Sequence, residues 1–268
     1  TTVSPTYAEE IQSSREYGFG LEGVLRRHRS KLKGILNGVE TTVWNPRTDP
    51  HLTKLGGTTY DVESVTEGKR ANKRALLQQA GLLPSDASKV DAVLEKPLIG
   101  TISRLVDQKG FDLVARILPF VVSEGASVVI QGSGPWEERL EEAAAPFSDS
   151  VYLHLRYDES FAHLIEAGAD FFWMPSRYEP CGLNQMYSMI YGTLPIVRHT
   201  GGLRDTVPDA DQAAPHSEGS SSPAGAPAGT TTATLPTVAS GSDSAVDPTP
   251  DGGVGFAFRA YDADALLG

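Results

Sequence analysis

Two positive charges, Arg104 and Lys109, lie five residues apart in a loop that follows a short apolar run at residues 98–103. A diphosphate leaving group needs positive charge where its own negative charge develops. Arginine offers a fixed fork of donors and lysine a mobile point charge, so the two residue types together suit that task. On spacing alone, a solvated loop with two ordinary surface charges is an equally good interpretation.

A second loop combines an acidic residue with glycine. Pro180 disfavours helical backbone at Glu179, so Glu179 is predicted in a loop and a helix is predicted to begin near Gly182. Glycine at this point lets a ligand approach the backbone, and the free N–H groups of a first helical turn form an anion site. A carboxylate in the same pocket can accept hydrogen bonds from sugar hydroxyls. The alternative is a strand–loop–helix connection with an exposed glutamate.

Two further positions follow predicted strands. Tyr157 precedes a helix capped by an aspartate, where an aromatic ring can stack on a base or pack at the edge of the domain. Gly201 and Gly202 are candidates for close backbone approach by a ligand, or for a simple turn.

The elements that must position these residues alternate between strand and helix. Short apolar runs predict buried parallel strands, and periodic stretches between them predict helices. The predicted strands are 98–103, 126–132, 151–155, 169–175 and 194–198, and the predicted helices are 111–123, 136–145, 158–168 and 182–191. Repeated β-α units of this length indicate an α/β fold with a doubly wound, Rossmann-like parallel sheet. Ligands bind at the carboxyl ends of the strands in such sheets, where the candidate residues fall.

Other segments differ in character. Residues 1–60 are turn-rich and are interpreted as a connecting segment packed on the sheet domain, and residues 63–82 predict an amphipathic helix. Residues 208–253 are low-complexity Ser, Gly, Ala, Pro, Thr and Asp, so we expect a disordered insertion because such a stretch cannot bury enough apolar area. Regular structure is predicted to resume at 254–258, within the same domain.

Composition narrows the classes of protein. The 268 residues carry a net charge of −11 with a pI of about 5, which argues against a nucleic-acid binder and an anionic membrane surface. The single cysteine, Cys181, excludes an internal disulfide and lacks an adjacent base that would make it a nucleophile. No apolar run approaches the ~20 residues of a membrane-spanning helix. His154 and His199 have no partners at metal-ligand spacing, so neither a metal nor a cofactor is predicted.

Several motifs together resemble those of bacterial glycogen synthases and plant or algal starch synthases. They occur in the family's order and cover nearly the whole chain except 208–253: VSPTYAEEI, GILNGVETTVWNPRTD, ISRLVDQKGFDL, QGSGP, the block 170–191 and TGGLRDTV. The resemblance implies a GT-B arrangement, in which two Rossmann-like domains face a cleft. It assigns 1–60 to the tail of the first domain and the interdomain connection, 61–207 to the donor-binding second domain, and 254–268 to that domain's truncated continuation.

The resemblance also implies roles for individual residues. Arg104 and Lys109 match the basic pair on the donor diphosphate, Glu179 the acidic contact to the donor glucose, and Tyr157 the aromatic ring on adenine. The expected catalytic residues are Arg104, Lys109 and Glu179, and the expected substrate-binding residues are Tyr157, Cys181, Gly182, Leu183, Asn184, Gly201 and Gly202. Related retaining transferases carry a second glutamate eight residues after the first, where this chain has Tyr187.

The implied reaction transfers glucose from ADP-glucose to the non-reducing end of an α-1,4-glucan with retention. The family's lysine- and glycine-rich loop and its first-domain histidine would precede Thr1, so the isolated chain is expected to be inactive and to need that N-terminal domain as a partner. The alternatives are a non-catalytic nucleotide-sugar-binding module and a related GT-B transferase that uses UDP-glucose. A eukaryotic source, favoured by the insertion, implies a plastid, and a bacterial source implies the cytoplasm.

Overall fold

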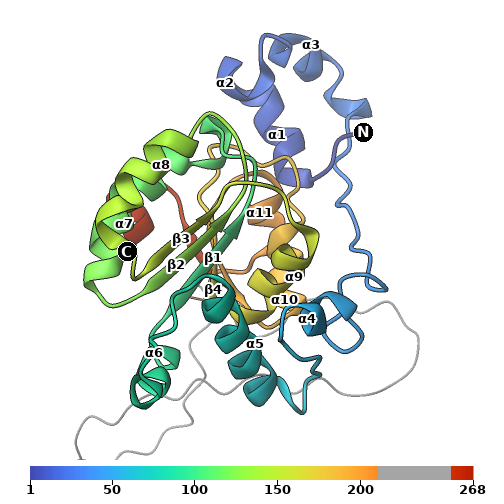
Figure 1. Cartoon of the computed structure of the whole chain (residues 1–268). Coiled ribbons are helices and arrows are strands. Elements are labelled where there is room, and N and C mark those ends of the chain that lie inside the picture. The colour runs from blue at the N-terminus through green and yellow to red at the C-terminus, as the bar shows by residue number, and fades with distance from the viewer. Residues whose placement is uncertain (211–254, 268) are drawn as a thin grey trace, which may run out of the picture.

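The computed structural model describes residues 1–210 and 255–267, so the expected disordered insertion lies, from residue 211 on, outside the described residues. In the described part, six parallel strands form one sheet in the order β3-β2-β1-β4-β5-β6 (Figure 1). The strands are β1 (Leu98–Ile102), β2 (Ser127–Gln131), β3 (Val151–His154), β4 (Phe171–Met174), β5 (Leu194–Arg198) and β6 (Phe256–Phe258). The expected α/β fold with a Rossmann-like parallel sheet is confirmed.

Helices cover both faces of this sheet, with α7 and α8 on one side and α5, α9 and α10 on the other (Figure 1). The helices of the sheet domain are α5 (Val65–Gln79), α6 (Val90–Leu94), α7 (Phe111–Ser123), α8 (Glu137–Ala144), α9 (Glu159–Gly168), α10 (Asn184–Ile190), α11 (Gly201–Thr206) and α12 (Ala263–Leu267). The N-terminal helices are α1 (Pro5–Ser13), α2 (Arg15–Gly18), α3 (Glu22–Arg27) and α4 (Pro50–Lys54). Short 3-10 turns lie at Arg29–Lys31, Ala87–Lys89, Asp107–Lys109 and Ala145–Phe147.

Successive strand residues point to opposite faces and therefore supply two separate cores. Leu98 and Phe172 pack with α5 and α9 on one face. Ile99 and Trp173, their chain neighbours, pack with α7 and α8 on the other. Burial on both faces explains why these strands are almost continuously apolar.

Most predicted boundaries lie within two residues of the observed ones, and the starts of α9 and α10 have clear local causes. Helix α9 begins after Asp158, whose carboxylate accepts a hydrogen bond from the backbone N–H of Phe161 at 3.0 Å, as an N-cap does. Helix α10 begins at Asn184 and not at Gly182, because Gly182 has a φ of 74°, which a right-handed helix does not contain.

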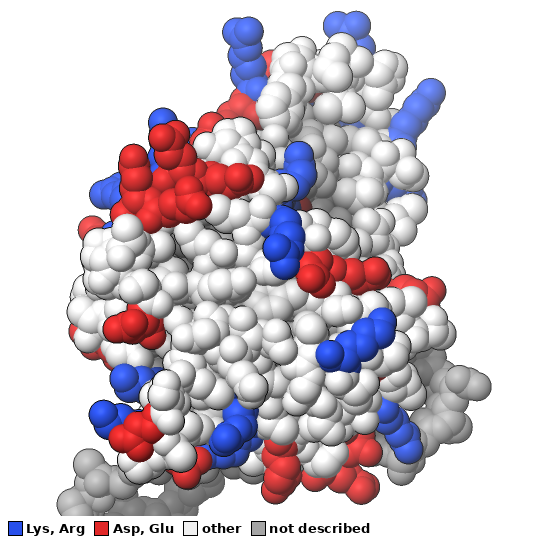
Figure 2. Space-filling view, viewed as in Figure 1, with Lys and Arg blue, Asp and Glu red and all other residues white. Residues whose placement is uncertain are grey.

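The N-terminal helices α1 to α3 stand beside the sheet domain, and α1 packs on α11 (Figure 1). An extended segment then leads to α4, which packs on α9. Acidic side chains gather over the Glu-rich helix α8, whereas Lys and Arg are scattered over the face shown in Figure 2. Among the described residues, no helix has the length and apolar character needed to cross a bilayer.

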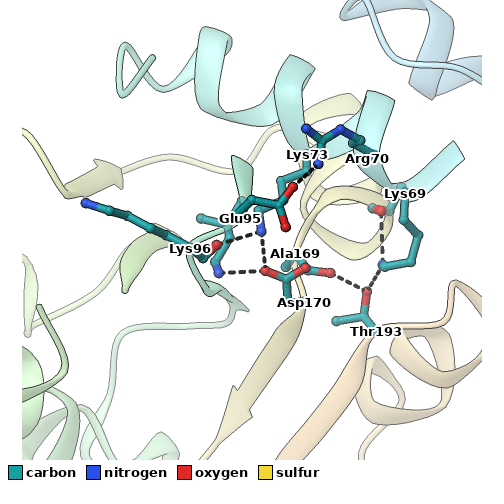
Figure 3. Close-up of polar contacts among 10 residues, drawn as sticks. Lys69, Arg70, Lys73, Glu95, Lys96, Ala169, Asp170 and Thr193 are labelled. Carbon is teal, nitrogen blue, oxygen red and sulfur yellow. Dashed lines mark hydrogen bonds and ion pairs between the residues drawn. The ribbon is translucent and has the colours of Figure 1, made fainter. Parts of the chain in front are cut away.

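Polar side chains of α5 tie the N-terminal ends of three strands together (Figure 3). Asp170, just before β4, accepts hydrogen bonds from Lys73 Nζ at 2.6 Å and from the backbone N–H of Leu98 at 2.8 Å. Thr193, just before β5, accepts one from Lys69 Nζ at 2.7 Å and donates to the carbonyl of Ala169 at 3.0 Å. These contacts fix the edge of the sheet opposite the carboxyl ends of the strands.

The two flanks of the segment that is not described meet. Asp209 and Gly255 form an isolated parallel bridge, and the N–H of Ala210 donates to the carbonyl of Gly255 at 2.8 Å. β6 then joins β5 in the same sheet. The chain therefore leaves and re-enters one sheet at one place.

Candidate functional site

A cavity of about 480 Å³ opens at the carboxyl ends of β1 and β4. The chain runs from β1 outward to β2 and β3, then returns to place β4 on the other side of β1. The loops after β1 and β4 consequently leave in opposite directions and part between the strands, which is where open α/β sheets bind ligands. The loops after β1, β2 and β4 and the start of α10 line the cavity.

The loop after β1 brings both predicted cations to this cavity. Arg104 is exposed, and within the part of the chain that the structure describes its guanidinium forms no hydrogen bond or ion pair. Lys109 ends a 3-10 turn that Gly110 closes with a φ of 79°. A Cβ at Gly110 would lie 2.1 Å from the carbonyl oxygen of Pro175, so only glycine lets this loop approach the loop after β4 so closely.

The lysine pairs with the predicted acidic residue. Lys109 Nζ donates to Glu179 Oε2 at 2.6 Å, and Ser176 Oγ donates to the same oxygen at 3.0 Å. The Glu179 side chain is 7% exposed and that of Lys109 is 19% exposed, so this ion pair lies at the wall of the cavity with its carboxylate largely removed from water. Two donors hold the carboxylate in one orientation.

The start of α10 forms another wall. Leu183 occupies the N-cap position, and the first amides of the helix have no acceptor within it. Asn184 Nδ2 donates to the carbonyl of Ile102 at 2.8 Å, which fastens the helix start to the end of β1. Gly182, Leu183 and Asn184 all line the cavity, as does the buried Cys181, whose thiol pKa is raised by burial. A thiol with a raised pKa is a poor nucleophile.

Tyr157 lies in the loop between β3 and α9 and also lines the cavity. Tyr157 is 72% exposed, which leaves its ring accessible for stacking on a planar ligand. The structure thus brings together Tyr157, Arg104, Lys109, Glu179 and the helix start around one space.

Gly201 and Gly202 lie behind the loop that carries Glu179 and are not among the residues that line the cavity. The N–H of Gly202 donates to the carbonyl of Glu179 at 2.9 Å. A Cβ at Gly201 would lie 1.9 Å from the Glu179 carbonyl oxygen, and one at Gly202 would lie 2.1 Å from that of Cys181. The close backbone approach expected of these glycines is therefore made by the protein's own loop, and direct ligand contact by them stays a prediction.

Sequence reasoning did not single out Asn37, Gln131 and Ser176, which also line the cavity. Asn37 lies in the segment interpreted as a connection, although it belongs to the quoted motif GILNGVE. Gln131 ends β2 and is fully buried, with its Nε2 donating to the carbonyl of Asp158 at 2.9 Å. No sequence pattern indicates a role for Ser176, which the structure places in hydrogen-bond contact with Glu179.

A stack of four aromatic rings lies away from the cavity. Trp44 stacks between Tyr187 and His163 with ring centroids 4.1 and 3.8 Å away, and His51 stacks on His163 at 4.3 Å. Tyr187, which replaces the second glutamate of related transferases, thus helps hold the N-terminal segment against α9 and α10.

One metal-type cluster emerges that sequence analysis did not consider. His51, His163 and Glu159 each place one potential ligand atom within 4.8 Å of the others. The two imidazole planes are only 24° from parallel and their centroids 4.3 Å apart, so they do not meet within the ~2.1 Å of a metal–nitrogen bond. We assign no metal centre to this arrangement.

Known proteins have sequences and a fold similar to those of this chain. The family model described as "Glycosyl transferases group 1" matches residues 85–219. The glycogen synthase of Alkalilimnicola ehrlichii is 48% identical over 213 residues, covering 79% of this chain and 42% of that protein. The glycogen synthase of Cellvibrio japonicus is 49% identical over 209 residues, covering 77% of this chain and 40% of that protein.

A solved structure matches the whole fold. The catalytic domain of starch synthase IV from Arabidopsis thaliana, bound to ADP and acarbose, aligns with a TM-score of 0.74 at 36% identity, covering 99% of this chain and 46% of that chain. The chain spans about two fifths of the length of the curated relatives it matches. It belongs to the group 1 glycosyltransferases, in the glycogen and starch synthase family, and its sheet is of the GT-B type.

Proposed function

We propose that this chain is the donor-binding part of an enzyme that transfers glucose from ADP-glucose to the non-reducing end of an α-1,4-glucan with retention. The observation that carries the proposal is the convergence of Arg104, Lys109, Glu179 and Tyr157 on one cavity at the switch point of the sheet. The glycogen synthase relatives and the starch synthase IV structure with ADP and acarbose support it.

In this proposal the cavity binds the donor in three parts. The ring of Tyr157 stacks on adenine, and Arg104, Lys109 and the first amides of α10 hold the diphosphate and stabilise its charge as it departs. The carboxylate of Glu179 accepts hydrogen bonds from glucose hydroxyls. Lys109 then has to interact with both Glu179 and the diphosphate, which places the sugar and the leaving group on either side of its ammonium group.

We infer retention without a covalent enzyme intermediate. Two hydrogen bonds to Oε2 hold the Glu179 carboxylate in one orientation, in which the proposal assigns it to the glucose hydroxyls, and burial raises the pKa of the Cys181 thiol. We therefore favour attack by the acceptor hydroxyl on the face that the phosphate leaves, with the phosphate taking the hydroxyl proton. The transition state is oxocarbenium-like, and cations beside the departing phosphate stabilise it most.

The domain assignment is part of the proposal. Residues 61–207 and 254–268 form the donor-binding domain, and residues 1–60 belong to the first domain and to the connection between the domains. The rest of that first domain supplies the opposite wall of the cleft and the glucan site. The bridge between Asp209 and Gly255 supports a surface insertion within one domain. The glycogen synthase relatives are bacterial, which favours a cytoplasmic location and gives no support to a plastid.

The test compares nucleotide sugars and variants. In the full-length gene product, radiolabelled glucose should pass to glycogen from ADP-glucose much faster than from UDP-glucose, and Arg104→Ala should lower kcat about 10²–10³-fold. The chain of 268 residues should bind ADP by calorimetry without transferring glucose. Transfer from UDP-glucose alone, or near-normal turnover by Arg104→Ala, would contradict the proposal.

A further inference from the structure

The N-terminal helix α1 is joined to the segment behind the Glu179 loop by side chains along its length. Ser4 Oγ donates to the carbonyl of Pro180 at 2.7 Å. The N–H and Oγ1 of Thr6 donate to the two carboxylate oxygens of Asp205 at 2.8 and 2.6 Å. These contacts join residues nearly two hundred positions apart in the chain.

Glu10 makes the contact nearest to the start of α11. Its Oε1 accepts hydrogen bonds from Thr200 Oγ1 at 2.8 Å and from the backbone N–H of Gly201 at 2.9 Å. Its Oε2 is buried and has no hydrogen-bond partner among the described residues. Burying one carboxylate oxygen without a partner costs free energy, because that oxygen loses its hydrogen bonds to water and gains none within the protein.

Gly201 connects the Glu10 contact to the candidate site, because it packs directly against the backbone of Glu179. There is no room for a Cβ between Gly201 and the carbonyl of Glu179, and the N–H of Gly202 donates to that carbonyl at 2.9 Å. The backbone of Glu179 is therefore in van der Waals contact with the peptide that Glu10 holds. Since packed backbone deforms little, a shift of Gly201 shifts Glu179.

We infer that Glu10 is a positioning residue, which sets the position of the Glu179 carboxylate through Gly201. This inference rests on the proposed function, in which Glu179 contacts the donor glucose. Because α1 belongs to the segment that the proposal assigns to the first domain, the contact also makes the Glu179 position depend on how that segment sits against α11. Glu10 lies outside the residues that line the cavity, so its effect on the reaction is indirect.

The inference predicts a selective effect on turnover. In the full-length gene product, Glu10→Ala removes the acceptor for both hydrogen bonds and should lower kcat for glucosyl transfer roughly 10- to 100-fold, since a misplacement near 1 Å costs about 10². The Kd for ADP should change less than about twofold, because its expected contacts are not held by Glu10. Glu10→Gln keeps an oxygen acceptor and should retain at least about half of the activity.

The control is Glu9→Ala, since Glu9 is the exposed neighbour on the same helix and its side chain makes no hydrogen bond or ion pair in the described structure. It should keep wild-type kcat. A second readout does not depend on activity: amide hydrogen exchange of residues 176–182 should be faster in Glu10→Ala than in Glu9→Ala.

The two readouts separate this inference from the proposed function. If the wild type transfers no glucose from ADP-glucose while exchange at 176–182 still responds to Glu10→Ala, the proposed function fails and the positioning by Glu10 stands. Unchanged exchange in Glu10→Ala overturns the inference. So does an equal loss of ADP affinity and of kcat, because that result indicates a general structural role.

Discussion

Replacing Lys109 by methionine should reduce stability as well as activity, and a second substitution should restore only the stability. Methionine keeps an unbranched stem of similar length but removes the ammonium group that lies 2.6 Å from Glu179 Oε2. The carboxylate is then left with the hydroxyl of Ser176 as its remaining donor among the described residues. Its side chain is only 7% exposed, so water from the cavity can replace the lysine only in part.

The size of the effect follows from this burial. Removing one member of a fully buried ion pair costs about 3–5 kcal/mol. The lysine side chain here is 19% exposed and the hydrogen bond from Ser176 is kept, so we expect the lower value of roughly 2–3 kcal/mol. For a domain of this size, that corresponds to a fall in Tm of roughly 5–10 °C.

The double variant Lys109→Met with Glu179→Gln separates charge pairing from catalysis. The amide oxygen still accepts from Ser176 and no charge remains unpaired, so the free energy of unfolding should return to within about 1 kcal/mol of the wild type. Turnover should stay at least about 10²-fold low, because the cation for the diphosphate is absent. Urea unfolding followed by tryptophan fluorescence gives the stability, and radiolabelled transfer from ADP-glucose to glycogen gives the activity.

Two results would refute this reasoning. If Lys109→Met is as stable as the wild type, or if the double variant is as unstable as the single one, the buried ion pair does not make the expected contribution to the free energy of unfolding. If Lys109→Met turns over normally, the lysine does not stabilise the leaving group.

Further predictions concern stacking, backbone contact and pH. Tyr157→Ala should raise the Kd for ADP roughly 5- to 100-fold with little change in Tm, whereas Tyr157→Phe should stay within about twofold; calorimetry decides, and equal binding by all three forms would rule out stacking. Gly201→Ala places a Cβ where the carbonyl of Glu179 lies and strains a φ of 44°, so kcat should fall about 10²-fold and stability by at least 1–2 kcal/mol, measured by turnover and urea unfolding; wild-type values for both would contradict the packing. Burial raises the pKa of Glu166 to about 8, so the folded state holds a proton there that the unfolded chain releases near pH 4.5, and this stability is present at low pH and lost as the pH rises through 8. Lys69, whose pKa burial lowers to about 7, is coupled to Glu166 by charge, so the comparison is made in a Lys69→Met background. There Glu166→Gln should lose less stability between pH 5 and pH 9 than the protein that keeps Glu166, by up to about 4 kcal/mol in urea unfolding at both pH values, and parallel pH profiles would show that Glu166 stays ionised.

Local patterns determined much of the fold. The apolar runs and the cap at Asp158 gave strand and helix positions close to the observed ones, since burial on both faces and capping act over a few neighbouring residues. The sequence also indicated that Arg104, Lys109, Glu179 and Tyr157 belong together. That inference needed only the rule that parallel strands end at one edge of the sheet, and the family motifs added chemical roles.

Only the tertiary structure decided how these residues interact. The ion pair between Lys109 and Glu179 joins positions 70 residues apart, and no local pattern indicates that the two charges touch. The start of α10 depends on the left-handed backbone of Gly182, which composition allows but does not require. The glycines at 201 and 202 are equally compatible with a ligand contact and with a contact inside the protein. Only the tertiary structure shows that their close approach is to the loop that carries Glu179.

The N-terminal segment shows the same limit most clearly. Its sequence indicated a connection, and its motifs indicated a family, but neither placed Asn37 at the cavity or Glu10 against Gly201. Such contacts depend on the positions of elements far apart in the chain, which are set by the packing of the whole sheet domain. Residue types and spacing thus indicated which chemical groups meet at the candidate site, and tertiary packing decided which side chains hold those groups in place.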